Sequence, residues 1–497
     1  MIQVHHVDPE FKHKLKKIFN GETFKFCYQC GTCTAVCPVA RLLDFYRPNK
    51  IIHLAKLGIR NVTQGNAVWL CAACNLCTEN CPQGVKVKDI MHALKDLGIE
   101  EGYTQESSKE FIMNVGMLSR FEEILSVLRD TIPIPIVYSW LCLSPCGENS
   151  KHSGFDELVT EILQHSLAAY KKEEMAPLPK THKEKVAIIG SGPAGLTAAW
   201  ELIRAGFPVT IFESLPIPGG MLRAGIPEYR LPKEVIDIEI ERIKGLGVEI
   251  RTNTPVNREL FNDLLKNGKY NAVFIATGAH RSGRLHIEGD DLEGVIPVLD
   301  LLRQYNFQQR AKVGKKVAVI GGGNTAIDAS RTAIRLGAEE VNILYRRSRD
   351  EMPANPWEVK EAESDGVKTQ FLTSPKRVIG KNGRVTALEC VKMMLGEPDE
   401  SGRRRPVPIK GSDFTIELDT LISAIGDEPD LSFLTRDVQI TETKTIAVDP
   451  LTLETSLPGV FAGGDAVLGS ASVVEAIVTG KVAATSINHY LISQRHT

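Results

Sequence analysis

The stretch Lys185-Val-Ala-Ile-Ile-Gly-Ser-Gly-Pro-Ala-Gly195 specifies the fold of the larger part of this chain. Its apolar run Val186–Ile189 predicts a fully buried strand, which a glycine-rich loop and an apolar helical pattern follow. The helical pattern ends at Gly206, and a second apolar run, Val209–Phe212, predicts the next strand. The order strand, glycine loop, helix, strand predicts a parallel βαβ unit of the Rossmann type.

Each glycine of this loop has a separate role. Gly190 permits a tight turn, Gly192 lets a pyrophosphate approach the backbone, and Gly195 lets the helix pack closely on the strand. The helix N-terminus then faces the phosphates. Glu213 follows the second strand directly, where it can accept hydrogen bonds from both ribose hydroxyls. The unit therefore predicts a bound dinucleotide, and the alternative is a glycine turn without a ligand.

A second copy of the pattern is Lys316-Val-Ala-Val-Ile-Gly-Gly-Gly-Asn-Thr-Ala326. Its second strand is expected at Val341–Tyr345 and is followed by Arg346-Arg347 rather than by an acid. A carboxylate there would repel a 2′-phosphate, whereas arginines bind one through charge-assisted hydrogen bonds. We therefore expect FAD in the first fold and NADP(H) in the second. The alternative for the arginine pair is a solvated turn that tolerates NAD(H).

Eight of the 11 cysteines form two runs of the same spacing. They are Cys27-Tyr-Gln-Cys30-Gly-Thr-Cys33-Thr-Ala-Val-Cys37-Pro38 and Cys71-Ala-Ala-Cys74-Asn-Leu-Cys77-Thr-Glu-Asn-Cys81-Pro82. This is the bacterial ferredoxin spacing, in which the fourth cysteine of each run binds the other cluster. We therefore expect one [4Fe–4S] cluster on Cys27, Cys30, Cys33 and Cys81, and another on Cys71, Cys74, Cys77 and Cys37. Two structural zinc sites are the alternative.

The residue composition and the hydrophobic pattern change along the chain, which predicts a multi-domain protein. An α-helical ferredoxin-like domain, with helical patterns at 51–57, 87–97 and 111–128, is expected over residues 1–130. A Pro-rich and charged linker over 131–184 follows it. Two Rossmann-like α/β domains complete the prediction: FAD binding over 185–300 and 427–497, and NAD(P)H binding over 301–426.

Composition narrows the class of protein. The chain has 497 residues, 43% of them hydrophobic, with 59 Lys and Arg against 61 Asp and Glu, so nothing favours nucleic acid as a partner. No apolar run is long enough for a membrane-spanning helix, and the stretch from Met1 to Lys14 lacks the apolar core of a secretion signal. We expect a soluble cytoplasmic protein.

Residues 185–497 resemble the small subunit of glutamate synthase and the large subunit of NADH-dependent ferredoxin:NADP oxidoreductase. The resemblance rests on Gly219-Gly-Met-Leu-Arg-Ala-Gly-Ile-Pro-Glu-Tyr-Arg-Leu-Pro232, Ala276-Thr-Gly278, Tyr345-Arg-Arg-Ser-Arg-Asp-Glu-Met-Pro353 and Gly459-Val-Phe-Ala-Gly-Gly-Asp465. The cysteine runs, with the helical patterns around them, resemble the helical ferredoxin module of heterodisulfide reductases. That resemblance implies a heterodisulfide-type partner.

The resemblance implies that Gly220–Pro232 lies near the flavin ring, that Asp465 contacts the ribityl chain and that Ala424-Ile-Gly426 lines the nicotinamide side. The predicted FAD contacts are Gly190, Ser191, Gly192, Pro193, Ala194, Gly195, Glu213, Gly220, Leu222, Arg230, Thr277, Gly278, Gly464 and Asp465. The predicted NADP contacts are Gly321, Gly323, Asn324, Thr325, Ala326, Arg346, Arg347, Ala424, Ile425 and Gly426.

Together these features predict an NAD(P)H-dependent oxidoreductase subunit that transfers electrons between NADP(H), FAD, two [4Fe–4S] clusters and a partner protein. The alternatives are a subunit of a ferredoxin-dependent, electron-bifurcating NAD(P) transhydrogenase and a non-catalytic, cofactor-bearing interaction subunit. The stretch from Ser214 to Leu231 contains no cysteine, which argues against thiol chemistry at the flavin. Cys390 is expected in the core of the nucleotide-binding domain. Cys142 and Cys146 are expected to be ordinary thiols near the linker, and the alternatives are further ligands or contacts with a partner's cofactor.

Overall fold

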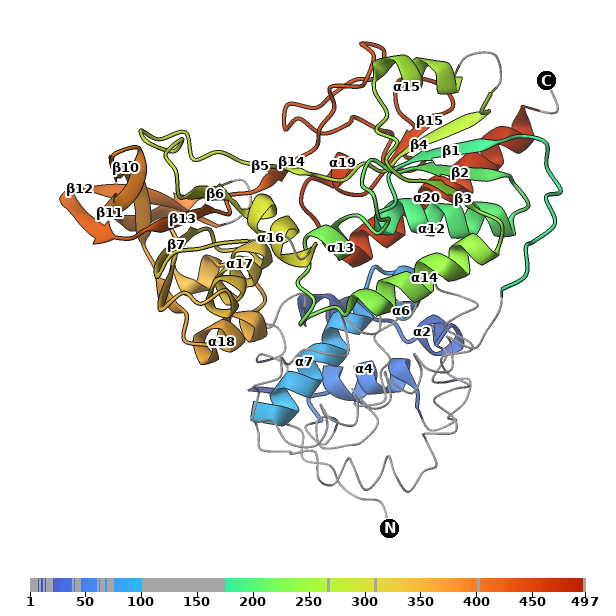
Figure 1. Ribbon diagram of the computed structural model, residues 1–497. Helices are drawn as coiled ribbons and strands as arrows, with labels where there is room; N and C mark the ends of the chain where they lie inside the picture. Colours follow the sequence, from blue (N-terminus) through green and yellow to red (C-terminus); the bar gives the residue numbers. More distant parts are fainter. Residues whose placement is uncertain are drawn as a thin grey trace. The chain divides into compact units, whose positions relative to one another are not determined.

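This computed structural model describes residues 21–37, 46–59, 76–100, 175–265, 269–307, 311–399 and 403–494, with residues 8, 10, 11, 14, 40, 62 and 68 (Figure 1). The chain divides into two compact units, and the described residues up to Glu100 and those from Met175 onward fall into different ones. None of the helices in these ranges combines the length and apolar character needed to cross a bilayer. Cys142, Cys146 and the predicted helix at 111–128 lie outside the described residues.

The described part of the N-terminal unit is helical. It contains the 3₁₀ helix η1 (Gly21–Phe26) and the helices α2 (Thr32–Ala35), α4 (Pro48–Lys56), α6 (Leu76–Glu79) and α7 (Val87–Glu100). Pro48 opens α4, as predicted, because its missing N–H needs no partner in the first turn. The apolar face of α7 buries Ile90, Met91 and Leu94. That helix continues through Gly98, where the sequence predicted its end, because one glycine costs a helix only about 1 kcal/mol.

The first α/β fold has a five-stranded parallel sheet of order β15-β4-β1-β2-β3. Its strands are β1 (Val186–Ile189), β2 (Val209–Phe212), β3 (Glu249–Arg251), β4 (Ala272–Ile275) and β15 (Val460–Ala462). Around it lie α12 (Pro193–Arg204), α13 (Met221–Ala224), α14 (Lys233–Gly245), α15 (Arg258–Leu265), α19 (Asp465–Leu468) and α20 (Val473–Ser493). Every residue of β1, β2 and β4 is buried, as expected for a parallel sheet covered on both faces.

The second α/β fold repeats this plan with the strand order β6-β13-β7-β8-β9. Its strands are β6 (Val295–Pro297), β7 (Lys316–Ile320), β8 (Glu340–Leu344), β9 (Lys368–Gln370) and β13 (Thr420–Ser423). Its helices are α16 (Val298–Asn306), α17 (Asn324–Arg335), α18 (Pro356–Ser364) and the short 3₁₀ helix η4 (Arg349–Glu351). Strand β6 pairs in this sheet although it lies inside the range predicted for the first fold.

A three-stranded antiparallel sheet extends the second fold. It consists of β10 (Thr373–Lys381), β11 (Arg384–Pro398) and β12 (Arg404–Glu417), which the sequence interpretation did not anticipate. The turn between β10 and β11 is Asn382-Gly383, with φ of 55° and 79°, which is a hairpin turn that favours Asn-Gly. Cys390 on β11 is fully buried in the core beneath this sheet, as predicted.

The chain passes between the two α/β folds through β5 (Arg281–Ser282) and β14 (Asp427–Glu428). These two short strands pair antiparallel, Arg281 with Glu428 and Ser282 with Asp427. The pairing brings together the outgoing and returning segments at one crossing (Figure 1).

Candidate functional site

The glycine loop of the first fold has the geometry that a pyrophosphate requires. Gly190 has φ of 103°, and a Cβ there would lie 2.4 Å from the carbonyl oxygen of Ala276. A Cβ on Gly195 would lie 2.0 Å from the carbonyl oxygen of Gly190. By contrast, a Cβ on Gly192 would meet nothing within 4 Å, so the loop is open on that side. Gly192 is the N-cap of α12 and has no side chain to cap it, which leaves the N-terminal N–H groups for a phosphate.

Glu213 is buried at the end of β2 and closes the loop. One of its carboxylate oxygens accepts hydrogen bonds from the backbone N–H and the hydroxyl of Ser191, and the other accepts one from Leu215 N at 2.8 Å. Ser191 Oγ accepts in turn from Gly219 N at 3.0 Å. Gly220 lies against the loop, since a Cβ on it would be 2.7 Å from Gly192 Cα. The predicted contact Leu222 is fully buried in α13.

Several predicted residues lie at the carboxyl ends of β4 and β15. The hydroxyl of Thr277 is buried without a hydrogen-bond partner among the described residues, and Gly278 beside it has φ of 66°. Gly464 N donates to Thr479 Oγ1 at 2.8 Å, and α19 begins at Asp465. Burial, followed by the nearby Asp427 charge, raises the pKa of Asp465 to about 6. An unpartnered buried hydroxyl and a half-buried carboxyl beside an open glycine loop fit the polar groups of FAD.

Sequence reasoning missed a half-buried polar pair next to these residues. Arg303 on α16 donates to His280 Nδ1 at 2.7 Å and to its carbonyl oxygen at 3.1 Å. Burial and the Arg303 charge lower the pKa of His280 to about 4, so this ring is neutral at pH 7. Burial also raises the pKa of Asp427 to about 6. His280 lies two residues after the recognised turn Ala276-Thr-Gly278, and nothing in the sequence indicates that Arg303 contacts it.

The second fold repeats the loop geometry. Gly321 has φ of 150°, and a Cβ there would lie 2.2 Å from the carbonyl oxygen of Ala424. A Cβ on Gly190 would meet the carbonyl oxygen of Ala276 in the same way. Gly323 is open, and Ala326, where the first fold has Gly195, is fully buried. Asn324 Oδ1 accepts a hydrogen bond from Asn355 N at 2.9 Å, and Thr325 follows in the first turn of α17. Of the residues predicted near the nicotinamide, Ile425 is 46% exposed and Gly426 has φ of 115°.

The two arginines after β8 have different surroundings. Gly190 N bonds to Phe212 O, and Gly321 N bonds to Leu344 O, so the position equivalent to Glu213 is Tyr345. Tyr345 is buried and donates its hydroxyl to Glu351 O at 2.7 Å. Arg346 is exposed, whereas Arg347 is buried and donates to Asp399 at 2.6 Å and to Arg404 O at 2.8 Å.

Arg230, a predicted FAD contact, forms ion pairs with acids of the second fold. Its guanidinium donates to both carboxylate oxygens of Asp328 at 2.7 Å and to Glu358 Oε1 at 2.6 Å. Both acids belong to helices of the second fold. The predicted contact of Arg230 with FAD stays a prediction.

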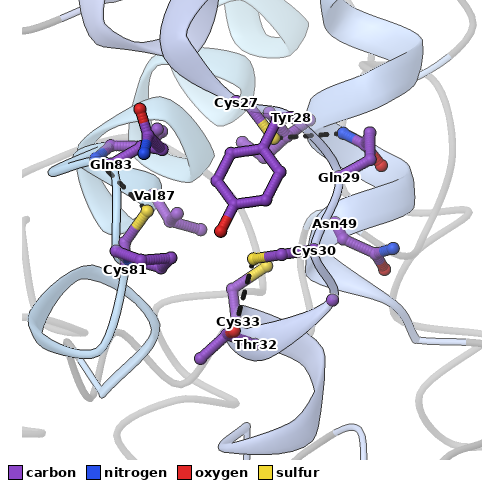
Figure 2. A pocket seen from close by; sticks show the side chains of 14 residues that line it. Cys27, Tyr28, Gln29, Cys30, Thr32, Cys33, Asn49, Cys81, Gln83 and Val87 are labelled. Atoms are coloured by element: carbon purple, nitrogen blue, oxygen red, sulfur yellow. Dashed lines mark hydrogen bonds between the residues drawn. The ribbon is translucent and has the colours of Figure 1, made fainter.

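The N-terminal unit brings four of the predicted ligands together. Figure 2 shows Cys27, Cys30, Cys33 and Cys81 around one pocket, with Tyr28 among them. The apolar side chains Ile52, Val85 and Val87 line the same pocket. Four thiols around one pocket fit the donor set of a [4Fe–4S] cluster. Across the described residues, no three His, Cys, Asp or Glu side chains converge tightly enough to hold a single metal ion.

The remaining ligands are described only in part. Cys37 and Cys77 are buried, with 7% and 8% of their surface exposed. Cys71 and Cys74 lie outside the described residues. The grouping of the first three cysteines of one run with the last of the other is the one expected from the ferredoxin spacing.

Comparison with known proteins assigns both parts of the chain. Residues 184–480 match the family model described as pyridine nucleotide-disulphide oxidoreductase. The chain belongs to this family. Residues 23–85 match the model of a 4Fe-4S dicluster domain. The protein is therefore an oxidoreductase that binds FAD, NAD(P) and two [4Fe–4S] clusters, as the sequence predicted.

Individual relatives agree with this assignment. The NADP(+)-dependent formate dehydrogenase subunit beta of Moorella thermoacetica is 42% identical, over 84% of this chain and only 60% of its own length. The glutamate synthase (NADPH) small chain of Escherichia coli K12 is 37% identical, over 64% of this chain and 71% of its own. The predicted likeness to the glutamate synthase small subunit is thus confirmed, whereas the likeness to the heterodisulfide reductase module stays a prediction.

A solved structure supports the fold alone. FprA of Mycobacterium tuberculosis in complex with NADPH aligns with a TM-score of 0.55 at 19% identity. The alignment covers 63% of this chain and 86% of that one.

Proposed function

We propose that this chain is the NADPH-linked flavin and iron–sulfur subunit of a redox complex, which transfers electrons between NADP(H) and a partner protein. The observation that carries the dinucleotide preference is Arg346. It is an exposed cation immediately after Tyr345, at the strand end where the first fold has the carboxylate Glu213. A 2′-phosphate is attracted by the arginine and meets no carboxylate at the position of Glu213. The relative from Moorella is named as NADP(+)-dependent, which agrees with this preference.

For FAD, we assign the pyrophosphate to the loop Gly190–Gly195 and the ribose to Glu213. The flavin side is assigned to Gly220, Leu222, Thr277, Gly278, Gly464 and Asp465. The support is the open face at Gly192 and the unpartnered hydroxyl of Thr277 among the described residues.

For NADP(H), we assign the pyrophosphate to Gly321, Gly323, Asn324, Thr325 and Ala326. The 2′-phosphate is assigned to Arg346, and the nicotinamide side to Ala424, Ile425 and Gly426. Arg347 is assigned a supporting role, because its guanidinium is held by the loop between β11 and β12 and by Arg404. Bound FAD exchanges a hydride with the nicotinamide and single electrons with iron–sulfur clusters. The chain's own residues bind and orient the two dinucleotides.

For the clusters, we assign Cys27, Cys30, Cys33 and Cys81 to one and Cys71, Cys74, Cys77 and Cys37 to the other. The thiol of Cys30 is exposed within its unit, so that cluster has a face toward a donor or acceptor. The partner is a protein with a one-electron centre of its own, such as a ferredoxin or another redox subunit.

The test is anaerobic reduction of the purified protein by NADPH and by NADH, followed through the flavin and cluster absorbance. We expect NADPH to bleach the flavin faster, and Arg346→Ala to lower the apparent kcat/KM for NADPH by roughly 10- to 100-fold, the worth of a charge-assisted contact. The rate with NADH should stay unchanged. Arg436→Ala removes an exposed arginine from the first fold and is the matched control.

The outcomes separate the two dinucleotides. Equal loss with NADPH and NADH in Arg346→Ala would contradict the 2′-phosphate assignment. Faster bleaching by NADH than by NADPH in the unaltered protein would contradict the NADPH preference itself.

A further inference from the structure

The segment Ile226–Leu231 joins α13 to α14 in the first fold, but its side chains reach the second. Arg230 forms ion pairs with Asp328 on α17 and Glu358 on α18. The side chain of Arg230 is 18% exposed, and those of Asp328 and Glu358 are 8% and 2% exposed. Nη1 of Arg230 donates to both carboxylate oxygens of Asp328, and Nη2 donates to Glu358 Oε1. Two acids on two helices therefore hold the guanidinium in one orientation.

Neighbouring contacts strengthen the attachment of the 226–231 segment to α17 and α18. The hydroxyl of Tyr229 donates to Asp328 O at 3.3 Å, and the guanidinium of Arg335 lies 4.0 Å from the centre of the Tyr229 ring. Arg335 also donates to Asp365 Oδ2 at 2.9 Å. Asn306 at the end of α16 donates to Ala224 O at 3.1 Å. Together these contacts join the segment around α13 to helices of the second fold.

The attachment runs from one glycine loop toward the other. Gly220, directly before α13, packs against Gly192 of the first loop. Asp328 is the fifth residue of α17, the helix that begins at Asn324 after Gly323 of the second loop. Because a helix moves as a rigid body, a contact that fixes Asp328 also fixes the glycine loop at the N-terminus of α17.

We propose that Arg230 is a positioning residue that fixes the nucleotide-binding fold relative to the flavin-binding fold, and so fixes the approach of the nicotinamide to the flavin. This role rests on the proposed function. It predicts that loss of Arg230 slows hydride transfer within the complex and leaves the affinity for NADPH little changed, because the 2′-phosphate and pyrophosphate contacts lie within the second fold.

The test uses the cofactor-loaded protein and two readouts. Stopped-flow flavin bleaching over a range of NADPH concentrations gives the limiting reduction rate and the apparent Kd. Hydrogen–deuterium exchange gives the protection of each segment without reference to activity. For Arg230→Met we expect a limiting rate lowered by about 10-fold or more, since a misplaced reactant loses orientation, and a Kd within about 3-fold of the unaltered protein. Exchange should rise in α13, the 226–231 segment and the first turns of α17 and α18, and not in β1 or α12.

Arg230→Met leaves two buried carboxylates without their cation, which can prevent folding. Arg230→Met combined with Asp328→Asn and Glu358→Gln removes that charge and keeps the side-chain volumes. It should fold, with the same slow transfer and raised exchange. Arg377→Met is the matched control, because it breaks an exposed ion pair with Glu389 inside one sheet. It should change neither readout.

Unchanged limiting rate and exchange in the triple variant would overturn the proposal. So would a rise in Kd with an unchanged limiting rate, which would make Arg230 a binding residue. If the unaltered protein is not bleached by NADPH, the proposed function fails, while raised exchange in the variant would still support the attachment between the folds.

Discussion

Gln29 and Thr32 lie between the cysteines of the first run and contact their sulfurs. Gln29 Nε2 donates to Cys27 Sγ at 3.1 Å, and Thr32 Oγ1 lies 3.2 Å from Cys30 Sγ (Figure 2). Gln29 adopts φ of 64°, an uncommon conformation for a residue other than glycine. Hydrogen bonds to ligand sulfurs stabilise the more negative, reduced form of an iron–sulfur cluster, so they raise its reduction potential.

Gln29→Ala should therefore lower the reduction potential of the cluster held by Cys27, Cys30, Cys33 and Cys81. The measurement is an EPR-monitored redox titration of the intact protein. Gln83→Ala is the control and should leave the potential unchanged, because Gln83 lines the same pocket and its side chain bonds to no sulfur of the described residues. A potential that is the same in both variants would rule out a role for the Gln29 amide.

The contacts of single residues also explain why the sequence could not assign separate roles to Arg346 and Arg347. The sequence aligned Arg346-Arg347 with Glu213, but the register of the two folds aligns Tyr345 with it. Only the contacts distinguish an exposed Arg346 from an Arg347 that is bound to Asp399 and Arg404 O. Those partners lie on distant segments, so no local pattern could have separated the two arginines.

Among the helices and strands, those next to the glycine loops were predicted closely. β1 and β2 have the predicted bounds, because four consecutive buried residues leave a strong local signal. β8 begins one residue before its predicted start and ends one residue early. The β10–β12 sheet was missed, although Asn382-Gly383 between two alternating segments is a hairpin signal.

The packing of α12 on α20 depends on Gly480. A Cβ at Gly480 would lie 2.4 Å from the carbonyl oxygen of Ala194, so the two helices approach more closely than alanine allows. Gly480→Ala should destabilise the protein by about 1–3 kcal/mol through overpacking. It should also reduce the FAD retained on purification, because Ala194 belongs to the proposed FAD loop. Thermal unfolding and the flavin content measure the two effects.

Thr485 lies on the exposed side of the same helix, so Thr485→Ala is the control for α20. An equal change in both variants, or an unchanged melting temperature in Gly480→Ala, would contradict the close-packing argument.

At the scale of the larger unit, the half-buried carboxyl of Asp427 lies where the chain crosses between the two α/β folds. Asp427 on β14 lies near Ser282 on β5 and Arg303 on α16, with Asp465 of α19 close enough to feel its charge. Burial raises the pKa of Asp427 from its ordinary value of 3.8 to about 6. Because the folded state holds this proton more tightly than the unfolded state, the group's contribution to stability falls as the pH rises from about 4 to 6.

Asp427→Asn removes that dependence. Its melting temperature relative to the unaltered protein should therefore increase between about pH 4 and pH 6 and stay constant above. Thermal unfolding at matched cofactor content measures it, with the exposed Asp437→Asn as the control. A difference that does not vary with pH would show that Asp427 ionises alike in the folded and unfolded chain.

The cofactor plan of this protein could be predicted from local stretches of sequence. Cysteine spacing, glycine loops and the residues at strand ends are local, because ligation and phosphate binding require several groups from one short segment. Only the tertiary structure shows which side chains make contacts between distant segments. Arg230 with Asp328 and Glu358, Arg303 with His280, and Gly480 with Ala194 are pairs far apart in the chain, and only the packing of buried surfaces brings them into contact.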